Sequence, residues 1–210
     1  YVRNWVNSNS IHLIDDEHDS YAFNVPLVVS MLQEYTESVG VRPHLSCGPR
    51  TYAMKEILNS LGIPSRVVDL FGFPENQTNK LLPHTLLEVW DRETGEWGLH
   101  DPDFNVVYID ERSGNVVSSV SALNSSTINL SYSSNTYKIE NMLNLTNTIK
   151  RLFKYAVLHR NTYEGKRSVL FMEDASNKLR ENVLDENGAS ISFRDYIKNR
   201  TLCFDVEELA

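Results

Sequence analysis

The chain has 210 residues, which suffice for one domain of ordinary size or for a compact domain with an appended part. Hydrophobic residues make up 41% and charged residues 23%, values that are typical of a globular protein. The formal net charge of −8 argues against a nucleic-acid partner, because neutralising phosphates requires clustered cations. No apolar run approaches the roughly 18 residues that a transmembrane helix needs, so no membrane span is expected.

The first part of the chain is predicted to be mainly helical. Residues 1–7 carry apolar side chains on one helical face, and residues 25–39 have apolar residues at helical spacing up to Gly40. The acidic segment 11–19 between them is predicted to be a loop. Its histidines and carboxylates are interpreted as solvated groups rather than as metal ligands.

A further helix is predicted to begin at Cys47. Pro49 follows closely, and proline is favoured in the first helical turn, where its missing N–H costs nothing. Gly62 is suited to the left-handed position that closes a helix, and Pro64 prevents the helix from resuming. Cys47 is therefore expected at or just before the N-terminus of a helix.

Four strands are predicted after this helix, at residues 66–71, 84–90, 97–101 and 106–110. The second and third strands are separated by a short polar turn in which Gly95 is suited to a positive φ. A helical segment followed by successive short strands with tight turns indicates an antiparallel sheet and an α+β fold.

Beyond the strands, the sequence predicts a linker and then a helical region. Residues 113–136 are rich in Ser and Asn and are interpreted as a linker or a loose excursion. Residues 139–159 have apolar residues at helical spacing, with their cations largely apart from that stripe. We expect residues 137–210 to be a mainly helical extension packed on a core of residues 1–112. The basic stretch 137–167 either docks on this acidic core or contacts a polyanion or a membrane surface.

The two cysteines, Cys47 and Cys203, lie far apart, and neither belongs to a C-x-x-C pair, which disfavours structural zinc or a redox dithiol. The sequence leaves open whether these two cysteines form a disulfide with each other. A thiol acts as a nucleophile when it is ionised, and a helix N-terminus stabilises the thiolate, as does a neighbouring imidazolium. The predicted position of Cys47 provides the first of these features, and the same helix-end N–H groups could form an oxyanion hole. A buried structural thiol is the alternative for this cysteine taken alone.

The predicted hairpin supplies a base and a carboxylate. If Trp90 faces Trp97, then His84 and Asp101 lie on the same face of the sheet as diagonal neighbours. A carboxylate in that place would fix the tautomer of the imidazole and stabilise its protonated form, the third role in a nucleophilic triad. Asp103 is the rival to Asp101 if regular strand pairing continues past residue 102.

Four ordered motifs carry a resemblance to a known family. They are Ser46-Cys-Gly-Pro-Arg-Thr-Tyr-Ala53, Leu61-Gly-Ile-Pro-Ser-Arg66, His84-Thr-Leu-Leu-Glu-Val-Trp90 and Leu99-His-Asp-Pro102. A Cys that opens a helix, a Gly-Ile-Pro-x-Arg signature, a His that starts a strand and an Asp-Pro on the next strand resemble the transglutaminase-like superfamily. Residues 3–6 also resemble the helix that precedes this domain in bacterial members. The resemblance covers about residues 1–110.

This resemblance implies an α+β, papain-like core in which the cysteine helix packs on an antiparallel sheet. It implies Cys47 as the nucleophile, His84 as general base and acid, and Asp101 as the orienting carboxylate. The expected reaction is thiol-dependent acyl transfer at an amide bond, by a cysteine peptidase, an amidase or a transglutaminase. The substrate would be a peptide, a protein or another amide, and no cofactor or metal is expected. Because the superfamily also includes inactive relatives, a non-catalytic interaction module is the alternative.

The sequence departs from the family pattern at Gly48-Pro49, where many transglutaminases have an aromatic residue directly after the cysteine. This departure argues against protein cross-linking. The upstream side chain that would complete the oxyanion hole stays open among His44, Gln33 and Tyr35. A third reading is a zinc ion held by the cysteine, histidine and aspartate, which would require tetrahedral geometry.

Overall fold

The computed structural model describes residues 1–72, 82–110 and 112–118, together with five strands further along the chain, 129–132, 155–161, 167–172, 182–184 and 190–192. The helices are α1 (Val2–Ser8), α2 (Asp16–Tyr21), α3 (Val25–Thr36) and α4 (Cys47–Ser60). The strands are β1 (Ser65–Gly72), β2 (Leu82–Asp91), β3 (Glu96–Asp101), β4 (Val106–Ile109), β5 (Asn129–Tyr132), β6 (Tyr155–Asn161), β7 (Arg167–Met172), β8 (Asn182–Leu184) and β9 (Ser190–Ser192). Of the helices described, none has the length and apolar character needed to cross a membrane.

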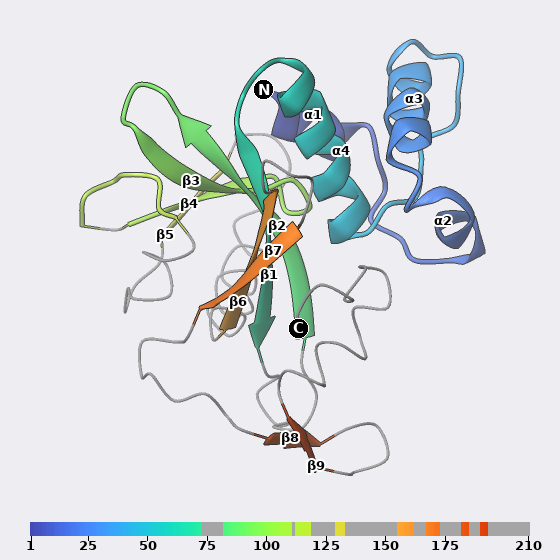
Figure 1. Ribbon diagram of the computed structural model, residues 1–210. Coiled ribbons are helices and arrows are strands. Elements are labelled where there is room, and N and C mark those ends of the chain that lie inside the picture. Colours follow the sequence, from blue (N-terminus) through green and yellow to red (C-terminus); the bar gives the residue numbers. More distant parts are fainter. Residues whose placement is uncertain are drawn as a thin grey trace.

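The strands form an antiparallel sheet, and the helices gather beside it (Figure 1). Seven strands pair in the order β5-β4-β3-β2-β1-β6-β7, while β8 and β9 form a separate pair. Helix α4 packs on β1 and β2, and it contacts α1 and α3 on its other sides. The α+β class predicted from the sequence is therefore confirmed.

Local sequence signals account for the start and end of α4. Pro49 lies in its first turn, and Ser46 precedes it in an extended conformation with φ −83° and ψ −176°. After the helix, Gly62 adopts a φ of +69°, and its N–H donates to the carbonyl oxygen of Asn59. The predicted start at Cys47 is confirmed, and it follows from residues that a single sequence displays directly.

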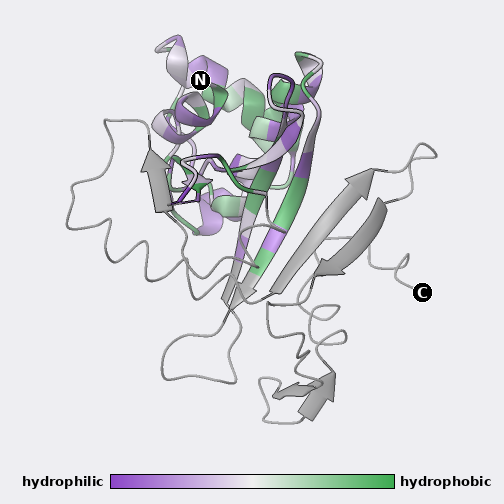
Figure 2. Ribbon diagram, turned by 90° about the vertical axis from the view of Figure 1, so that its left-hand side faces the viewer, coloured by the Kyte–Doolittle hydropathy of each residue, from purple (hydrophilic) through white to green (hydrophobic). Residues whose placement is uncertain are grey.

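The hydrophobic core lies between the helices and one face of the central strands. Val6 of α1, Leu32 of α3 and Leu58 of α4 are buried there against Val67 and Leu87 of the sheet. In Figure 2 the hydrophobic segments of these strands are interrupted by hydrophilic residues. Full burial of each large aliphatic side chain contributes about 1.5–3 kcal/mol, so this cluster fixes α4 on the sheet.

The register of the β2–β3 hairpin is the predicted one. Trp90 pairs with Trp97, and their rings meet edge to face at a centroid distance of 5.3 Å. Beside them the guanidinium of Arg66 lies 4.0 Å from the centroid of the Trp97 ring, and its Nε donates to Glu88 at 2.5 Å. Arg66 is therefore the ion-pair partner of Glu88.

Two predictions for the N-terminal part need correction. The segment 11–19 was expected to be a loop, but helix α2 begins within it at Asp16. The Asp15 carboxylate accepts the N–H of His18 at 2.9 Å and so caps the first turn. Helix α3 ends at Thr36 rather than near Val39, since the chain leaves it through Ser38, whose φ is +62°.

The prediction of a mainly helical C-terminal region is wrong where the structure describes it. The expected helix 139–159 overlaps strand β6, which pairs with the edge of β1 through Val68, Asp69 and Leu70. A strand forms there because the edge of β1 offers backbone hydrogen-bond partners. The helical spacing of apolar residues in the sequence gives no information about those partners. In the expected linker 113–136, residues 129–132 form β5 and pair with β4. The remainder of the expected helix, 139–154, lies outside the described residues.

Candidate functional site

The thiol of Cys47 lies at the N-terminus of α4. It is a half-buried free cysteine and forms no disulfide in the described structure. In the described part of the chain, no hydrogen bond is formed by the N–H groups of Cys47 and Gly48, which lie too early in α4 to find an intrahelical acceptor. One turn further on, the hydroxyl of Thr51 donates to the carbonyl oxygen of Thr85 at 2.9 Å and fixes α4 against β2.

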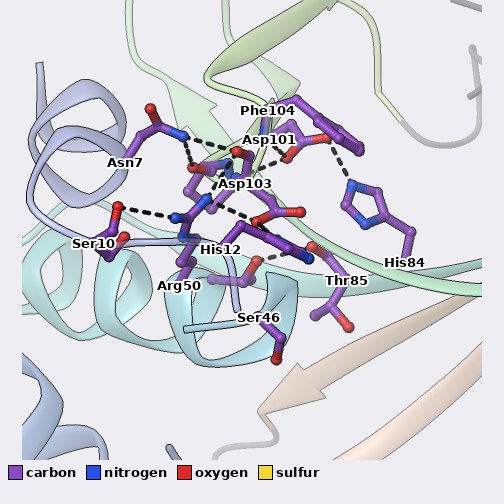
Figure 3. A network of polar contacts seen from close by, with 12 residues as sticks. Asn7, Ser10, His12, Ser46, Arg50, His84, Thr85, Asp101, Asp103 and Phe104 are labelled. Atoms are coloured by element: carbon purple, nitrogen blue, oxygen red, sulfur yellow. Dashed lines mark hydrogen bonds and ion pairs between the residues drawn. The ribbon is translucent and has the colours of Figure 1, made fainter. Parts of the chain in front are cut away.

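His84 and Asp101 form a buried hydrogen-bonded pair. Nε2 of His84, near the start of β2, lies 2.8 Å from Oδ2 of Asp101, the last residue of β3 (Figure 3). The exposed fractions of the two residues are 5% and 0%. The sequence-based expectation that Asp101 reaches the His84 ring is confirmed, and it follows from the hairpin register.

The carboxylate of Asp101 accepts hydrogen bonds on both oxygens. Oδ2 accepts the hydroxyl of Tyr108 at 2.8 Å, in addition to His84. Oδ1 accepts the backbone N–H groups of Asp103 at 2.9 Å and Phe104 at 3.0 Å. A buried carboxylate with this set of donors is held in one orientation, so it also fixes the imidazole plane.

The electrostatics of the pair favour a protonated imidazole. Burial alone would lower the pKa of His84, but the Asp101 carboxylate and hydrogen bonds with Asp101 and Cys47 outweigh it and raise the pKa well above the usual value. Because Nε2 is taken by Asp101, Nδ1 is the ring nitrogen left for the thiol. The ring of Phe104 lies 4.9 Å from the His84 ring, between centroids, and covers the pair.

The hydroxyl of Tyr108 stays a hydrogen-bond donor over a wide pH range. Burial raises the pKa of Tyr108 well above 10, and the nearby charge of Asp101 and the hydrogen bond to it raise it further. The tyrosine therefore supports the carboxylate without competing for a proton at neutral pH.

Asp103, the rival considered from the sequence, has a different set of partners. Its carboxylate lies 2.9 Å from Nη1 of Arg50 and 2.7 Å from Nδ1 of His12. Its backbone carbonyl accepts Nδ2 of Asn7 at 2.7 Å (Figure 3). Burial alone would raise the pKa of Asp103, but the hydrogen bond with His12 and the charges of His84 and Arg50 hold it below the usual value. Asp103 thus joins α1 and α4 to the β3–β4 turn.

His100, the residue before Asp101, is partly buried, and Nη1 of Arg3 donates to its Nδ1 at 3.3 Å. Burial and the charge of Arg3 lower the pKa of His100 to about 4, so the ring is neutral. The N-terminal helix, which the sequence left without a tertiary partner, provides this contact.

The three residues considered for the oxyanion hole all have other partners. Nε2 of Gln33 donates to Glu37 at 2.9 Å, and Nδ1 of His44 lies 2.9 Å from Asp15. Tyr35 lies under the guanidinium of Arg42, 5.9 Å from the ring centroid.

Sequence reasoning missed a histidine that contacts the cysteine turn. Nε2 of His18 in α2 lies 3.0 Å from the hydroxyl oxygen of Ser46, the residue before Cys47. The available signal was the Asp15 cap followed by an acidic first turn, which indicates a short helix around His18.

The sequence matches no protein-family model, and a search of curated proteins finds no significant match. Across the described residues, no group of three or more His, Cys, Asp or Glu side chains is arranged to hold a metal ion. The proposal for function therefore depends on the geometry of the site and on the sequence motifs.

Proposed function

We propose that this protein is a thiol-dependent acyl-transfer enzyme that acts on amide bonds through Cys47, His84 and Asp101. The observation that carries the proposal is the buried hydrogen bond between His84 and Asp101. It is supported by the thiol at the N-terminus of α4, which contributes to the raised pKa of His84. A nucleophile, a base and an orienting group in this order are the components of a catalytic triad. The resemblance of the four sequence motifs to transglutaminase-like, papain-like enzymes supports the same assignment.

The reaction begins from an ion pair in which the proton of the Cys47 thiol already resides on His84, so that the thiolate faces an imidazolium. The thiolate attacks the carbonyl carbon of the amide, and the resulting oxyanion accepts hydrogen bonds from the N–H groups of Cys47 and Gly48. His84 then donates its proton to the leaving nitrogen, so an amine departs and a thioester remains. Asp101 keeps its negative charge throughout and stabilises the imidazolium.

The second half of the cycle returns the free thiol. A water molecule or a primary amine loses a proton to His84 and attacks the thioester carbonyl, and the thiolate leaves and is reprotonated. Water gives hydrolysis, whereas an amine gives transfer. Apart from its chain neighbours and the backbone of its own helix, none of the described residues lies within 4 Å of a Cβ built at Gly48, so these residues leave room for a substrate on this side of the helix N-terminus.

The proposal is tested with a library of peptide amides and glutamine amides, each assayed with and without a primary amine acceptor. The Cys203→Ala variant serves as the matched control, because it leaves Cys47 as the single thiol. We expect this control to keep activity and Cys47→Ala to lose at least about a hundredfold, since the members of a triad act as a unit. Equal activity in the two variants would exclude Cys47 as the nucleophile.

A second measurement does not need the substrate. In the Cys203→Ala background, iodoacetamide should alkylate Cys47 rapidly even at pH 6, because the imidazolium of His84 stabilises the thiolate. Replacing His84 by Ala should remove the fast reaction at pH 6 while leaving alkylation at pH 9. An unchanged profile would favour a non-catalytic module with this fold.

A further inference from the structure

A hydrogen-bonded chain of side chains reaches the residue that precedes the nucleophile. Nδ1 of His18 lies 2.8 Å from the carboxylate of Asp19, and Nε2 lies 3.0 Å from Oγ of Ser46. In the tautomer that donates its Nδ1–H to Asp19, the ring accepts the Ser46 hydroxyl on Nε2. His18 is only 4% exposed, so water does not compete freely for this contact.

Ser46 occupies the N-cap of α4 but does not act as a cap. A serine at this position usually accepts the N–H of the second or third helical residue, yet no such bond is formed here. The third residue is Pro49, which has no N–H, so Gly48 is the donor that Ser46 could accept. The contact with His18 directs the hydroxyl away from that donor.

The position of His18 is itself fixed on two sides. Its backbone N–H donates to the Asp15 carboxylate at 2.9 Å, which holds the first turn of α2. Its ring meets Phe23 edge to face at a centroid distance of 6.3 Å. The imidazole therefore acts as a stationary partner for the Ser46 hydroxyl.

We propose that His18 is a positioning residue that keeps the Ser46 hydroxyl off the N-terminus of α4 and so leaves the Gly48 N–H available to the substrate oxyanion. This inference rests on the proposed function, because an oxyanion forms only in an acyl-transfer reaction. Without His18, the hydroxyl would turn to Gly48, and the oxyanion would have to displace it. The hydrogen bond from Gly48 to the oxyanion forms only in the transition state. Weakening it therefore lowers kcat and preserves KM.

The test compares His18→Leu, Ser46→Ala and the double variant in the full chain, with His18→Gln as the conservative replacement. Leucine keeps the bulk of the side chain but cannot bond to Ser46, so kcat should fall about three- to thirtyfold, the range of a serine cap. Ser46→Ala should stay within about twofold of the wild type, and adding it to His18→Leu should restore kcat, because no hydroxyl remains to compete. Glutamine should retain most of the activity, since its amide can still bond to the hydroxyl.

The rescue separates positioning from a merely structural role. If His18 only filled space, removing the Ser46 hydroxyl would not restore His18→Leu. A double variant as slow as His18→Leu, or a Ser46→Ala variant equally slow, would overturn the proposal. Should His18→Leu fail to fold, His18→Ala takes its place in the same comparison.

Amide hydrogen exchange at Gly48 gives a readout that is independent of activity. Exchange at Gly48 should slow about three- to thirtyfold in His18→Leu and return to the wild-type rate in the double variant. Identical exchange in the wild type and His18→Leu would refute the role of His18. Absence of any amide-cleaving activity in the wild type would instead refute the proposed function, while the exchange experiment still decides on His18.

Discussion

Replacing Asp101 by Asn changes the candidate site without changing its size. The wild-type carboxylate accepts His84 and Tyr108 on one oxygen, and the N–H groups of Asp103 and Phe104 on the other. An asparagine has a single oxygen. If that oxygen keeps the backbone N–H groups, the NH₂ group faces His84 and forces its Nε2 to accept. The proton then sits on Nδ1, where the ring cannot take the proton of the thiol.

The contacts of Asp101 set the size of two expected effects, the loss of folding stability and the loss of kcat. Removing one member of a buried ion pair costs about 3–5 kcal/mol, a figure that already includes the groups left unpaired, so we expect destabilisation of about 3–5 kcal/mol. The wrong tautomer in a triad lowers kcat about 10⁴-fold. Urea denaturation measures the first quantity and amide turnover the second.

The pH dependence of the destabilisation gives a further check on the same variant. The pKa of His84 is raised in the folded protein above its usual value of 6.5, so its contribution is fully present below pH 6.5 and is lost as pH rises through the folded-state pKa. The stability difference between wild type and Asp101→Asn should therefore shrink in alkaline solution. A difference that grows with pH would contradict the proposed charge state.

Asp103→Asn is the matched control, since Asp103 is equally buried and also holds a cation, Arg50. We expect it to lose about 3–5 kcal/mol of stability while the kcat of the folded protein changes less than about tenfold. Turnover by Asp101→Asn within about tenfold of the wild type, or an equal loss in both variants, would refute the assignment of Asp101.

Three more outcomes are expected. Tyr108→Phe should cost about 1.5–3 kcal/mol of stability, because Asp101 loses a charge-assisted hydrogen bond, and should lower kcat less than tenfold in the same two assays. The folded-state pKa of His100 lies below its unfolded value, so stability should fall between pH 6.5 and about 4. Because part of the ring is exposed, we expect about 2 kcal/mol, and urea denaturation of His100→Asn should show a flatter acid profile. Truncation after Gly114 removes β6 from the edge of β1 and buried Val117 from the core, so the fragment should aggregate or lose several kcal/mol; a soluble, cooperatively folded fragment with unchanged Cys47 alkylation would contradict this.

The sequence predicted the parts of the site whose signals are local. Pro49 and Gly62 mark the two ends of the cysteine helix, and the turn at Gly95 sets the register that brings Asp101 beside His84. Because side chains alternate with a period of two, a shift of the register by one residue would put His84 and Asp101 on opposite faces, so the position of the turn decides whether they can meet. The catalytic roles remain predictions.

The parts that were missed depend on long-range contacts. Strand β6 forms because the edge of β1 accepts it, although its own sequence has helical spacing of apolar residues. His18 contacts Ser46 across 28 residues, and no local pattern indicates that contact. The choice between Asp101 and Asp103 was likewise decided by Arg50, which takes Asp103 as its partner from a helix 53 residues away.

The contacts that join the first helix to the turn around Asp103 affect when the candidate site can form during folding. Arg3 reaches Asn105 across 102 residues, and Asn7 reaches Asp103 across 96, so the first helix docks on a turn that is made much later in synthesis. Contacts of such separation close slowly, because chain entropy must be lost before they form. In a nascent chain Cys47 is made before His84 and Asp101, so during synthesis the thiol has neither the imidazole nor the carboxylate beside it. Under the proposed function, the thiol would therefore gain its reactivity only after residues 84 and 101 have been made and have folded against α4.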